Sequence, residues 1–249
     1  GNTSGNGQEM KVEFLSCGDC AFSVQFGERI ERALNERVIQ IKAVVDAAGF
    51  EGMVETVPSY RALMVHYDPL RTSQAKLIDD IGPFLDQTVD RPMGGTYWRI
   101  PACYDPEFAP DLEYVAGCAD MTPERMIEIH TAIPHYVYML GFAPGQPHMG
   151  DLPQELAIPR RKDPRPVVEK GSIVTATGLS IIYPVTNASG WHIIGRSPVS
   201  VFDVEKDPPA LFVAGDTVNF YSVSLDEYHE IRQMIDEGRF DPEQKKAHT

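Results

Sequence analysis

The sequence lacks the signatures of several self-contained enzyme classes. It contains no Gly-x-x-x-x-Gly-Lys-Ser/Thr phosphate loop, no paired zinc-binding motif and no nucleophile elbow. We therefore expect neither an autonomous ATPase nor a serine hydrolase. No apolar run approaches the roughly 18 to 20 residues of a membrane span, and the first residues show no basic and apolar signal-peptide pattern. These absences predict a soluble, cytoplasmic protein.

Basic residues are scarce in this chain. The 22 lysines and arginines stand against 36 aspartates and glutamates, so the formal net charge is −14. A chain of this charge repels polyanions, which argues against nucleic acid or an anionic membrane as its main partner. Any anion must therefore be bound by a local basic pocket.

Cysteine is also sparse, with four residues in all. Cys17 and Cys20 have the spacing of a redox or zinc motif, but a matching second pair is missing because Cys103 and Cys118 lie fifteen positions apart. We expect reduced, packed thiols and no metal site.

The length and apolar content predict two domains. With 249 residues, 43% of them hydrophobic, the chain can bury sizeable cores. Residues 1–9 are small and polar and are expected to form a disordered leader or tag remnant. We predict an N-terminal α+β domain over 10–88, a second domain over 95–225, and a C-terminal helix with a polar tail over 226–249.

The first domain alternates short strands with two amphipathic helices. Apolar residues recur at helical spacing from Ile30 to Ala48, Gly49 supplies a stop signal, and a second helix is predicted over Thr72 to Leu85. Two short strand patterns precede each helix. This order favours a small sheet with both helices on one face, ferredoxin-like in outline.

The second domain contains many short strand patterns at close spacing, which predicts a barrel or a sandwich. Its later strands are expected to include Val199–Phe202 and Ala210–Phe212. A final amphipathic helix is predicted over Leu225–Glu237, followed by a polar tail over Arg239–Thr249.

The stretch from Leu140 to Arg196 is the best candidate for a functional site. Glycine and proline recur too densely from Leu140 to Gly150 for an ordinary helix or a regular strand, so the backbone is expected to hold a series of turns. Apolar and β-branched runs between such turns predict buried strands and exclude a linker. Cations are also concentrated here in an otherwise acidic chain: Arg160, Arg161, Lys162, Arg165, Lys170 and Arg196.

Several ordered motifs in this stretch resemble those of one family. They are Gly141-Phe142-Ala143-Pro144-Gly145, Pro159-Arg160-Arg161 with Pro164-Arg165, Tyr183-Pro184, and Gly190-Trp191-His192-Ile193-Ile194-Gly195-Arg196. With further matches between Met10 and about Ser224, the chain is identified as a member of the allophanate hydrolase subunit 1 / KipI family. That family includes the B-type subunit of the prokaryotic ATP-dependent 5-oxoprolinase.

The resemblance implies an α+β fold: a small α/β N-terminal domain followed by a cyclophilin-like β-barrel domain. It also implies a subunit of 5-oxoprolinase, which cleaves 5-oxo-proline to glutamate together with an allophanate hydrolase subunit 2-type subunit and a third subunit. ATP, with Mg²⁺, would then serve the complex, and no cofactor would stay tightly bound to this chain. Two alternatives remain open, a KipI-like inhibitor of a histidine kinase and a carboxyltransferase-type subunit of urea or allophanate metabolism.

The arginines are candidate anion-binding or partner-binding residues. The guanidinium groups of Arg160, Arg161 and Arg165 suit a carboxylate, a phosphate or an acidic partner, although they could also solvate a hairpin. Arg196 follows a buried-looking run and needs a partner, which could be a ligand or an internal carboxylate such as Asp203.

Other residues of the motifs are candidates for catalysis or for the pocket wall. His148 could donate or accept a proton, or bond the backbone of its own loop. Tyr183 and Trp191 are expected in the core or the pocket wall, and His130 is expected to be a core histidine. Four residues are predicted to shape the loop: Gly141, Phe142, Pro144 and Gly145.

The chain departs from the commonest family pattern in two motifs. Many members carry Gly-Phe-Pro-Tyr-Leu-Gly where this chain has Gly145-Gln146-Pro147-His148-Met149-Gly150, and many carry Ser-Pro-Gly-Gly-Trp where it has Asn187-Ala188-Ser189-Gly190-Trp191. Both changes replace apolar or aromatic contacts with hydrogen-bonding groups. They bear on the substrate and leave the family assignment intact.

Overall fold

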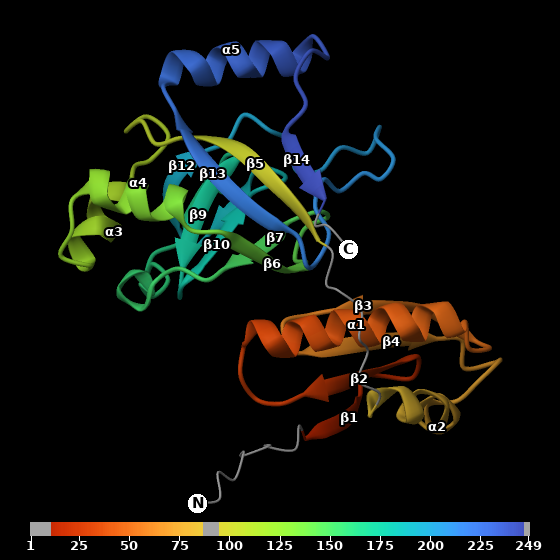
Figure 1. Cartoon of the computed structure of the whole chain (residues 1–249). Helices are drawn as coiled ribbons and strands as arrows, with labels where there is room; N and C mark the ends of the chain where they lie inside the picture. The colour runs from red at the N-terminus through yellow and green to blue at the C-terminus, as the bar shows by residue number, and fades with distance from the viewer. Residues whose placement is uncertain (1–10, 87–94, 247–249) are drawn as a thin grey trace, which may run out of the picture. The chain divides into compact units, whose positions relative to one another are not determined.

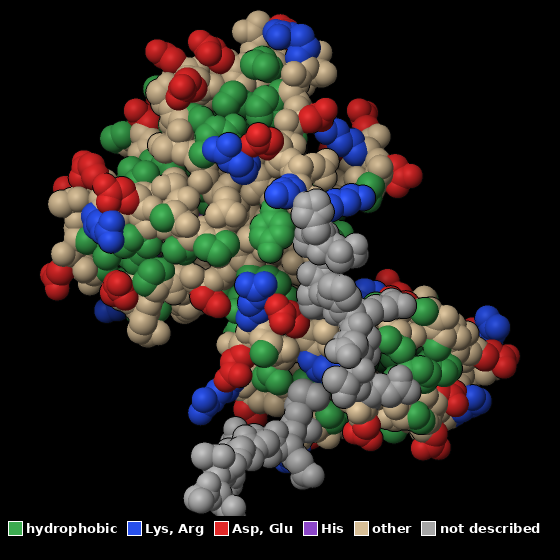
Figure 2. Space-filling model, viewed as in Figure 1, with side chains coloured by type: hydrophobic (Ala, Val, Ile, Leu, Met, Phe, Trp, Pro, Cys, Tyr) green, Lys and Arg blue, Asp and Glu red, His purple; other side chains and the backbone are tan. Residues whose placement is uncertain are grey.

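The computed structural model describes residues 11–86 and 95–246 and divides into two compact units, Gly1–Met93 and Gly94–Thr249 (Figure 1). The predicted leader over 1–9 and most of the predicted boundary between the domains lie outside the described residues. Acidic side chains are spread over both units on the face shown in Figure 2, in keeping with the net charge of −14. None of the described helices is long and apolar enough to cross a membrane.

The first unit is a four-stranded antiparallel sheet with two helices, in the strand order β1-β2-β4-β3. Its elements are β1 (Val12–Ser16), β2 (Ala21–Phe26), α1 (Arg32–Ala48), β3 (Met53–Pro58), β4 (Ala62–Tyr67) and α2 (Gln74–Leu85). The order β-β-α-β-β-α is a circular permutation of the ferredoxin-like order β-α-β-β-α-β, with the last strand moved to the start.

Both helices cover the same face of this sheet. Phe22 of β2 and Val65 of β4 are paired across the two strands, and they pack with Ile41 of α1 and Leu77 of α2 in one fully buried core. Helix α1 ends at Gly49, whose φ of 60° lies in the left-handed region that favours glycine. The apolar spacing seen in the sequence is thus the spacing of the buried helix faces.

The second unit is a barrel with helices around it. Its first elements are β5 (Thr96–Cys103), α3 (Leu112–Cys118), α4 (Pro123–Ala132), β6 (His135–Leu140), β7 (Pro147–Gly150), the 3-10 helix η1 (Gln154–Leu156) and β8 (Arg165–Val168). They are followed by β9 (Ser172–Ala176), β10 (Leu179–Ile182), β11 (Asn187–Ser189), β12 (His192–Arg196), β13 (Thr217–Val223), α5 (Leu225–Asp236) and β14 (Glu243–Lys246).

Seven of these strands close on themselves in the order β12-β9-β10-β7-β6-β13-β5, because β12 pairs again with β5 through Arg196 and Cys103. Strands β13 and β5 run parallel, and the other neighbours are antiparallel. Strands β8 and β11 form a separate two-stranded ribbon. In Figure 1, α3 and α4 lie at one side of the barrel and α5 lies at another. The predicted α+β fold with a barrel domain is confirmed.

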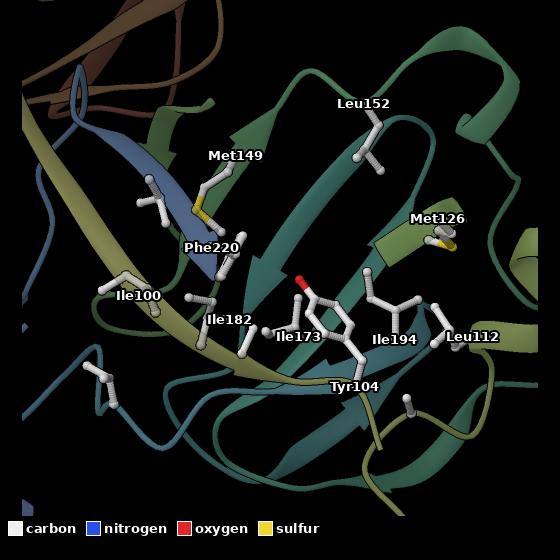
Figure 3. Packing of buried hydrophobic residues seen from close by; sticks show 14 of the residues in the cluster. Ile100, Tyr104, Leu112, Met126, Met149, Leu152, Ile173, Ile182, Ile194 and Phe220 are labelled. Atoms are coloured by element: carbon white, nitrogen blue, oxygen red, sulfur yellow. The ribbon is translucent and has the colours of Figure 1, made fainter. Parts of the chain in front are cut away.

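The barrel is filled with aliphatic and aromatic side chains. Ile100 of β5, Met149 of β7, Ile173 of β9, Ile194 of β12 and Phe220 of β13 meet inside it (Figure 3). Full burial of each such side chain stabilises the fold by about 1.5 to 3 kcal/mol. This core fixes the strands from which the site residues project.

Two predictions about strands are wrong. Pro147–Gly150, where only turns were expected, is strand β7, and its neighbours β6 and β10 supply the pairing that proline and glycine do not favour locally. Val199–Phe202 and Ala210–Phe212 were expected as strands, but they share only an isolated bridge between Phe202 and Ala210. Val199, Val201 and Phe212 are buried in the barrel core, although these segments form no regular sheet strand.

The predicted polar tail is also partly wrong. Glu243–Lys246 is strand β14, which pairs antiparallel with Thr96–Arg99 of β5. All four of its residues are exposed, so backbone hydrogen bonds to the edge of β5 hold the strand in place. No apolar pattern could have indicated it. Residues 247–249 lie outside the described part of the chain.

Candidate functional site

A pocket of about 230 Å³ lies between the loop that follows β6 and strand β11 of the ribbon. Five of the predicted site residues line it: Phe142, His148, Arg160, Tyr183 and Trp191. The barrel strands and the ribbon therefore bring together residues that are separated by up to about fifty positions in the sequence.

His148 lies on strand β7 and is 3% exposed. Its Nε2 donates to the carbonyl oxygen of Gly141 at 3.3 Å, and its ring centre lies 5.4 Å from that of Phe142. Burial lowers the pKa of His148 below its ordinary value of 6.5, the Gly141 carbonyl opposes this shift, and the charge of Arg160 adds to it. The imidazole is therefore neutral at pH 7. The backbone bond predicted for His148 is confirmed, and its catalytic role stays a prediction.

Arg160 supplies the positive charge of the pocket. Its side chain is exposed, and its guanidinium carbon lies 5.7 Å from the ring centre of the buried Trp191. A guanidinium held over an indole face is positioned without the loss of its hydrogen-bond donors. Arg160 can therefore bind an anion that enters the pocket.

A hydrogen-bonded group of three residues forms one wall. The hydroxyl of Tyr183 donates to Ser189 Oγ at 2.8 Å, and the backbone N–H of Trp191 donates to the same oxygen at 3.0 Å. Ser189 is on β11 and is 6% exposed. The sequence prediction of Tyr183 and Trp191 missed Ser189, which lies between them in the network.

The opposite wall is the tight loop between β6 and β7. Gly145 has a φ of 70°, and a Cβ atom on it would lie 2.8 Å from the side chain of Phe202. Phe142 also has a positive φ, of 66°, and its side chain is 91% exposed. Pro144 is exposed in the same loop, which begins at Gly141. Only glycine fits position 145 without displacing Phe202.

Arg161 and Arg165 do not line the pocket. They bind the carboxylate of Asp111, which is 4% exposed at the start of α3. Arg165 contributes two bonds of 2.6 and 2.8 Å, Arg161 contributes one of 3.1 Å, and the backbone N–H of Ile193 adds one of 2.8 Å. Asp111 therefore joins the start of α3 to β8 through Arg165 and to β12 through Ile193.

Arg196 also lies away from the pocket. Its guanidinium carbon is 4.4 Å from the ring centre of Phe108, which in turn lies 4.6 Å from the ring centre of Tyr228 on α5. The predicted pairing with Asp203 is wrong, since one carboxylate oxygen of Asp203 accepts from the backbone N–H of Glu205 within its own turn. The fold directs Arg196 toward helix α5 instead.

His130 is a core histidine, as predicted. Its ring is fully buried, with Nδ1 2.6 Å from the hydroxyl of Tyr104 and its backbone oxygen accepting from His135. Burial holds the pKa of His130 well below its ordinary value. It contributes to the barrel interior and not to the pocket.

The two motifs that depart from the family pattern meet at the pocket. The varied positions that line it are Gln146, His148, Asn187, Ala188 and Ser189. Sequence reasoning had singled out only His148 among them. The two motifs that contain the others had been named from the sequence, but no role had been assigned to these residues.

Metal-ligating residues are scattered. Across 11–86 and 95–246, no group of three or more His, Cys, Asp or Glu side chains is placed to hold a metal ion. All four cysteines are free thiols, but only Cys103 is buried. The prediction of packed thiols is therefore wrong for Cys17, Cys20 and Cys118, which are exposed.

The sequence model of the carboxyltransferase domain, subdomain C and D, matches residues 12–212, and the chain belongs to this family. It is 34% identical over 235 residues to the B-type subunit of 5-oxoprolinase from Bacillus subtilis, covering 90% of this chain and 98% of that protein. The family assignment made from the motifs is thus confirmed.

Solved structures share the fold of this chain. A crystal structure of TTHA0988 superimposes with a TM-score of 0.72 at 31% identity, covering 82% of this chain and 40% of that one. The matched part of this chain therefore accounts for 40% of TTHA0988. Urea carboxylase of Kluyveromyces lactis, at a TM-score of 0.79 and 17% identity over 96% of this chain and 24% of that one, shares the fold.

Proposed function

We propose that this chain is the B-type subunit of an ATP-dependent 5-oxoprolinase, which opens the lactam of 5-oxo-proline to give glutamate. The observation that carries the proposal is a small pocket that pairs one exposed arginine with a neutral, buried histidine. The support from relatives is the similarity to the B-type 5-oxoprolinase subunit of Bacillus subtilis along 98% of its length.

The pocket residues have distinct roles in this proposal. Arg160 binds the carboxylate of 5-oxo-proline, and the acidic remainder of the chain makes this local cation the favoured anion site. Opening the lactam adds water across the C–N bond, so the carbonyl carbon gains an oxygen and the ring nitrogen gains a proton. His148, neutral at pH 7, can accept a proton from one partner and release it to another.

The pocket is small compared with pockets that enclose drug-sized ligands. Its volume of about 230 Å³ is below the roughly 300 to 1,000 Å³ of pockets for drug-sized ligands. ATP and Mg²⁺ therefore enter the proposal as ligands of the assembled complex. The partners we propose are an allophanate hydrolase subunit 2-type subunit and a third subunit, and the isolated chain should be catalytically silent.

The test is co-purification with candidate partner subunits, followed by an assay of ATP-dependent glutamate release from 5-oxo-proline. Arg160→Ala should raise KM roughly ten- to a hundredfold, the loss expected for one charge-assisted contact. Arg125→Ala is the matched control, because Arg125 is an exposed arginine on α4 whose partner is Glu128. Unchanged kinetics for Arg160→Ala, or turnover by the chain alone, would contradict the proposal.

The alternatives are outcomes of the same experiment. A preparation that releases no glutamate but blocks phosphorylation of a histidine kinase would establish the KipI-like role. Carboxyl transfer from carboxylated biotin to urea would establish a role in urea or allophanate metabolism.

A further inference from the structure

Two polar side chains in the pocket keep hydrogen-bonding groups that the described part of the protein does not use. They are Gln146, on the loop before β7, and Ser189, on β11. Both are more than nine-tenths buried. The side-chain amide of Gln146 is not among the fully enclosed polar atoms that lack a partner, so it is open to the pocket and within reach of a ligand.

The hydroxyl hydrogen of Ser189 is available for hydrogen bonding to a ligand. Its oxygen already accepts from the Tyr183 hydroxyl and from the Trp191 backbone N–H. A serine hydroxyl has two acceptor sites and one hydrogen, so both acceptor sites are occupied and the hydrogen is free to donate. The same two bonds hold the oxygen in place, which makes Ser189 a fixed donor at the pocket wall.

The side-chain amide of Gln146 is available for hydrogen bonding to a ligand. Its backbone is held by two bonds of 3.1 Å, one from its N–H to Ala143 and one from the Gly141 N–H to its carbonyl. Its side chain has no hydrogen-bond partner among the described residues, although it is 4% exposed and lines the pocket. The amide therefore faces the pocket with its N–H and oxygen available to a ligand.

We infer that Gln146 and Ser189 recognise the amide edge of a small lactam whose carboxylate is bound by Arg160. A lactam presents its carbonyl oxygen and its N–H on the same edge. The side-chain amide of Gln146 offers the complementary N–H and oxygen, and Ser189 adds a second donor for the lactam oxygen. This inference rests on the proposed function, and it assigns substrate specificity to two positions at which the chain departs from its family.

The size and composition of the pocket favour such a ligand. A volume of about 230 Å³ suits a single-ring acid better than a nucleotide. A site built to hydrogen-bond a substrate group rejects an analogue that lacks the group more strongly than an apolar pocket could. The lactam edge, and not only the carboxylate, should therefore determine affinity.

The test is calorimetric titration of the full chain with 5-oxo-proline and with cyclopentanecarboxylate, which has the same ring size and carboxylate but no amide. Gln146→Met and Ser189→Ala should each weaken 5-oxo-proline binding roughly three- to tenfold, as expected for one or two neutral hydrogen bonds. They should leave cyclopentanecarboxylate binding within about twofold, because that ligand makes no use of either group. Arg160→Ala should weaken both ligands.

Matched controls are Gln154→Met and Ser222→Ala, which make the same replacements at exposed positions outside the pocket. Melting temperatures of all variants report whether the fold is intact. Equal binding of the two ligands by the wild-type chain, no binding of either, or an equal loss for both ligands in Gln146→Met and Ser189→Ala would overturn the inference.

The outcome separates this inference from the proposed function. Selective lactam binding by the chain, combined with a reconstituted complex that releases no glutamate, would refute the proposed function and leave the inference standing. An active complex whose KM for 5-oxo-proline is unchanged in Gln146→Met and Ser189→Ala would refute the inference alone.

Discussion

Arg160 and Arg165 belong to one cationic stretch, but their replacement by alanine should have opposite consequences. Arg165 forms a two-bond ion pair with Asp111, at 2.6 and 2.8 Å, and that carboxylate is 4% exposed. Arg160 is exposed at the pocket and contacts the face of Trp191. The first arginine is therefore expected to stabilise the barrel unit, and the second to bind a ligand.

The size of the stability loss in Arg165→Ala depends on the hydrogen bonds that Asp111 keeps in the variant. Removing one partner of a buried ion pair costs about 3 to 5 kcal/mol, because a charge is left buried without compensation. Here Arg161 and the N–H of Ile193 still bond the carboxylate, and the Arg165 side chain is 25% exposed. We therefore expect a loss of about 2 to 3 kcal/mol for Arg165→Ala. At about 2 to 4 °C per kcal/mol, the barrel should melt about 4 to 12 °C lower.

Differential scanning calorimetry of Arg165→Ala, Arg160→Ala and the surface control Arg125→Ala measures these losses directly. Arg160→Ala and Arg125→Ala should stay within about 0.5 kcal/mol of the wild type, as exposed substitutions usually do. A melting temperature for Arg165→Ala within about 2 °C of the wild type would refute the assignment of a structural ion pair. So would an equal loss in Arg160→Ala.

Three further predictions concern the barrel interior, the pocket loop and the thiols. Burial lowers the pKa of His135 from 6.5 to about 4, so the unfolded chain is protonated first as the pH falls. Barrel stability should be complete above pH 6.5 and should fall toward pH 4 by about 3 kcal/mol from His135 alone, with a further loss from His130, whose pKa burial also lowers. Melting curves that do not change over this range would contradict the prediction. Gly145→Ala should lower the free energy of unfolding by about 2 kcal/mol or more, because alanine is strained at positive φ and its Cβ would meet Phe202. Urea denaturation that shows no loss of stability would contradict this prediction. A thiol reagent should modify the three exposed cysteines of the native protein and should react with Cys103 only after unfolding. A Cys17–Cys20 disulfide or stoichiometric zinc in the purified protein would contradict the prediction of free thiols.

The sequence alone determined most of the regular structure and the family. Helical spacing identified α1 and α2, and the Gly49 stop signal appears as a left-handed residue at the end of α1. These features are local, because apolar periodicity records which side of a segment is buried and glycine records a backbone angle that other residues avoid. The motifs between Gly141 and Arg196 identified the family for a similar reason, because each motif is recognised from the residues that it contains.

Only the tertiary structure decided which residues form the pocket. Nothing local distinguishes Arg160 from Arg161 or Arg165; the difference is Asp111, about fifty positions earlier, which the fold brings to two of the three. Strand β14 was hidden for the same reason, because it is held by backbone pairing with β5 and by the ion pair between Arg99 and Glu243, and neither partner can be recognised from the local sequence. Gln146 and Ser189 are 43 positions apart and meet because the β6–β7 loop and the β8–β11 ribbon converge. Burial can be read from a pattern along the chain, whereas the choice of a partner depends on which distant groups the closed barrel places within reach.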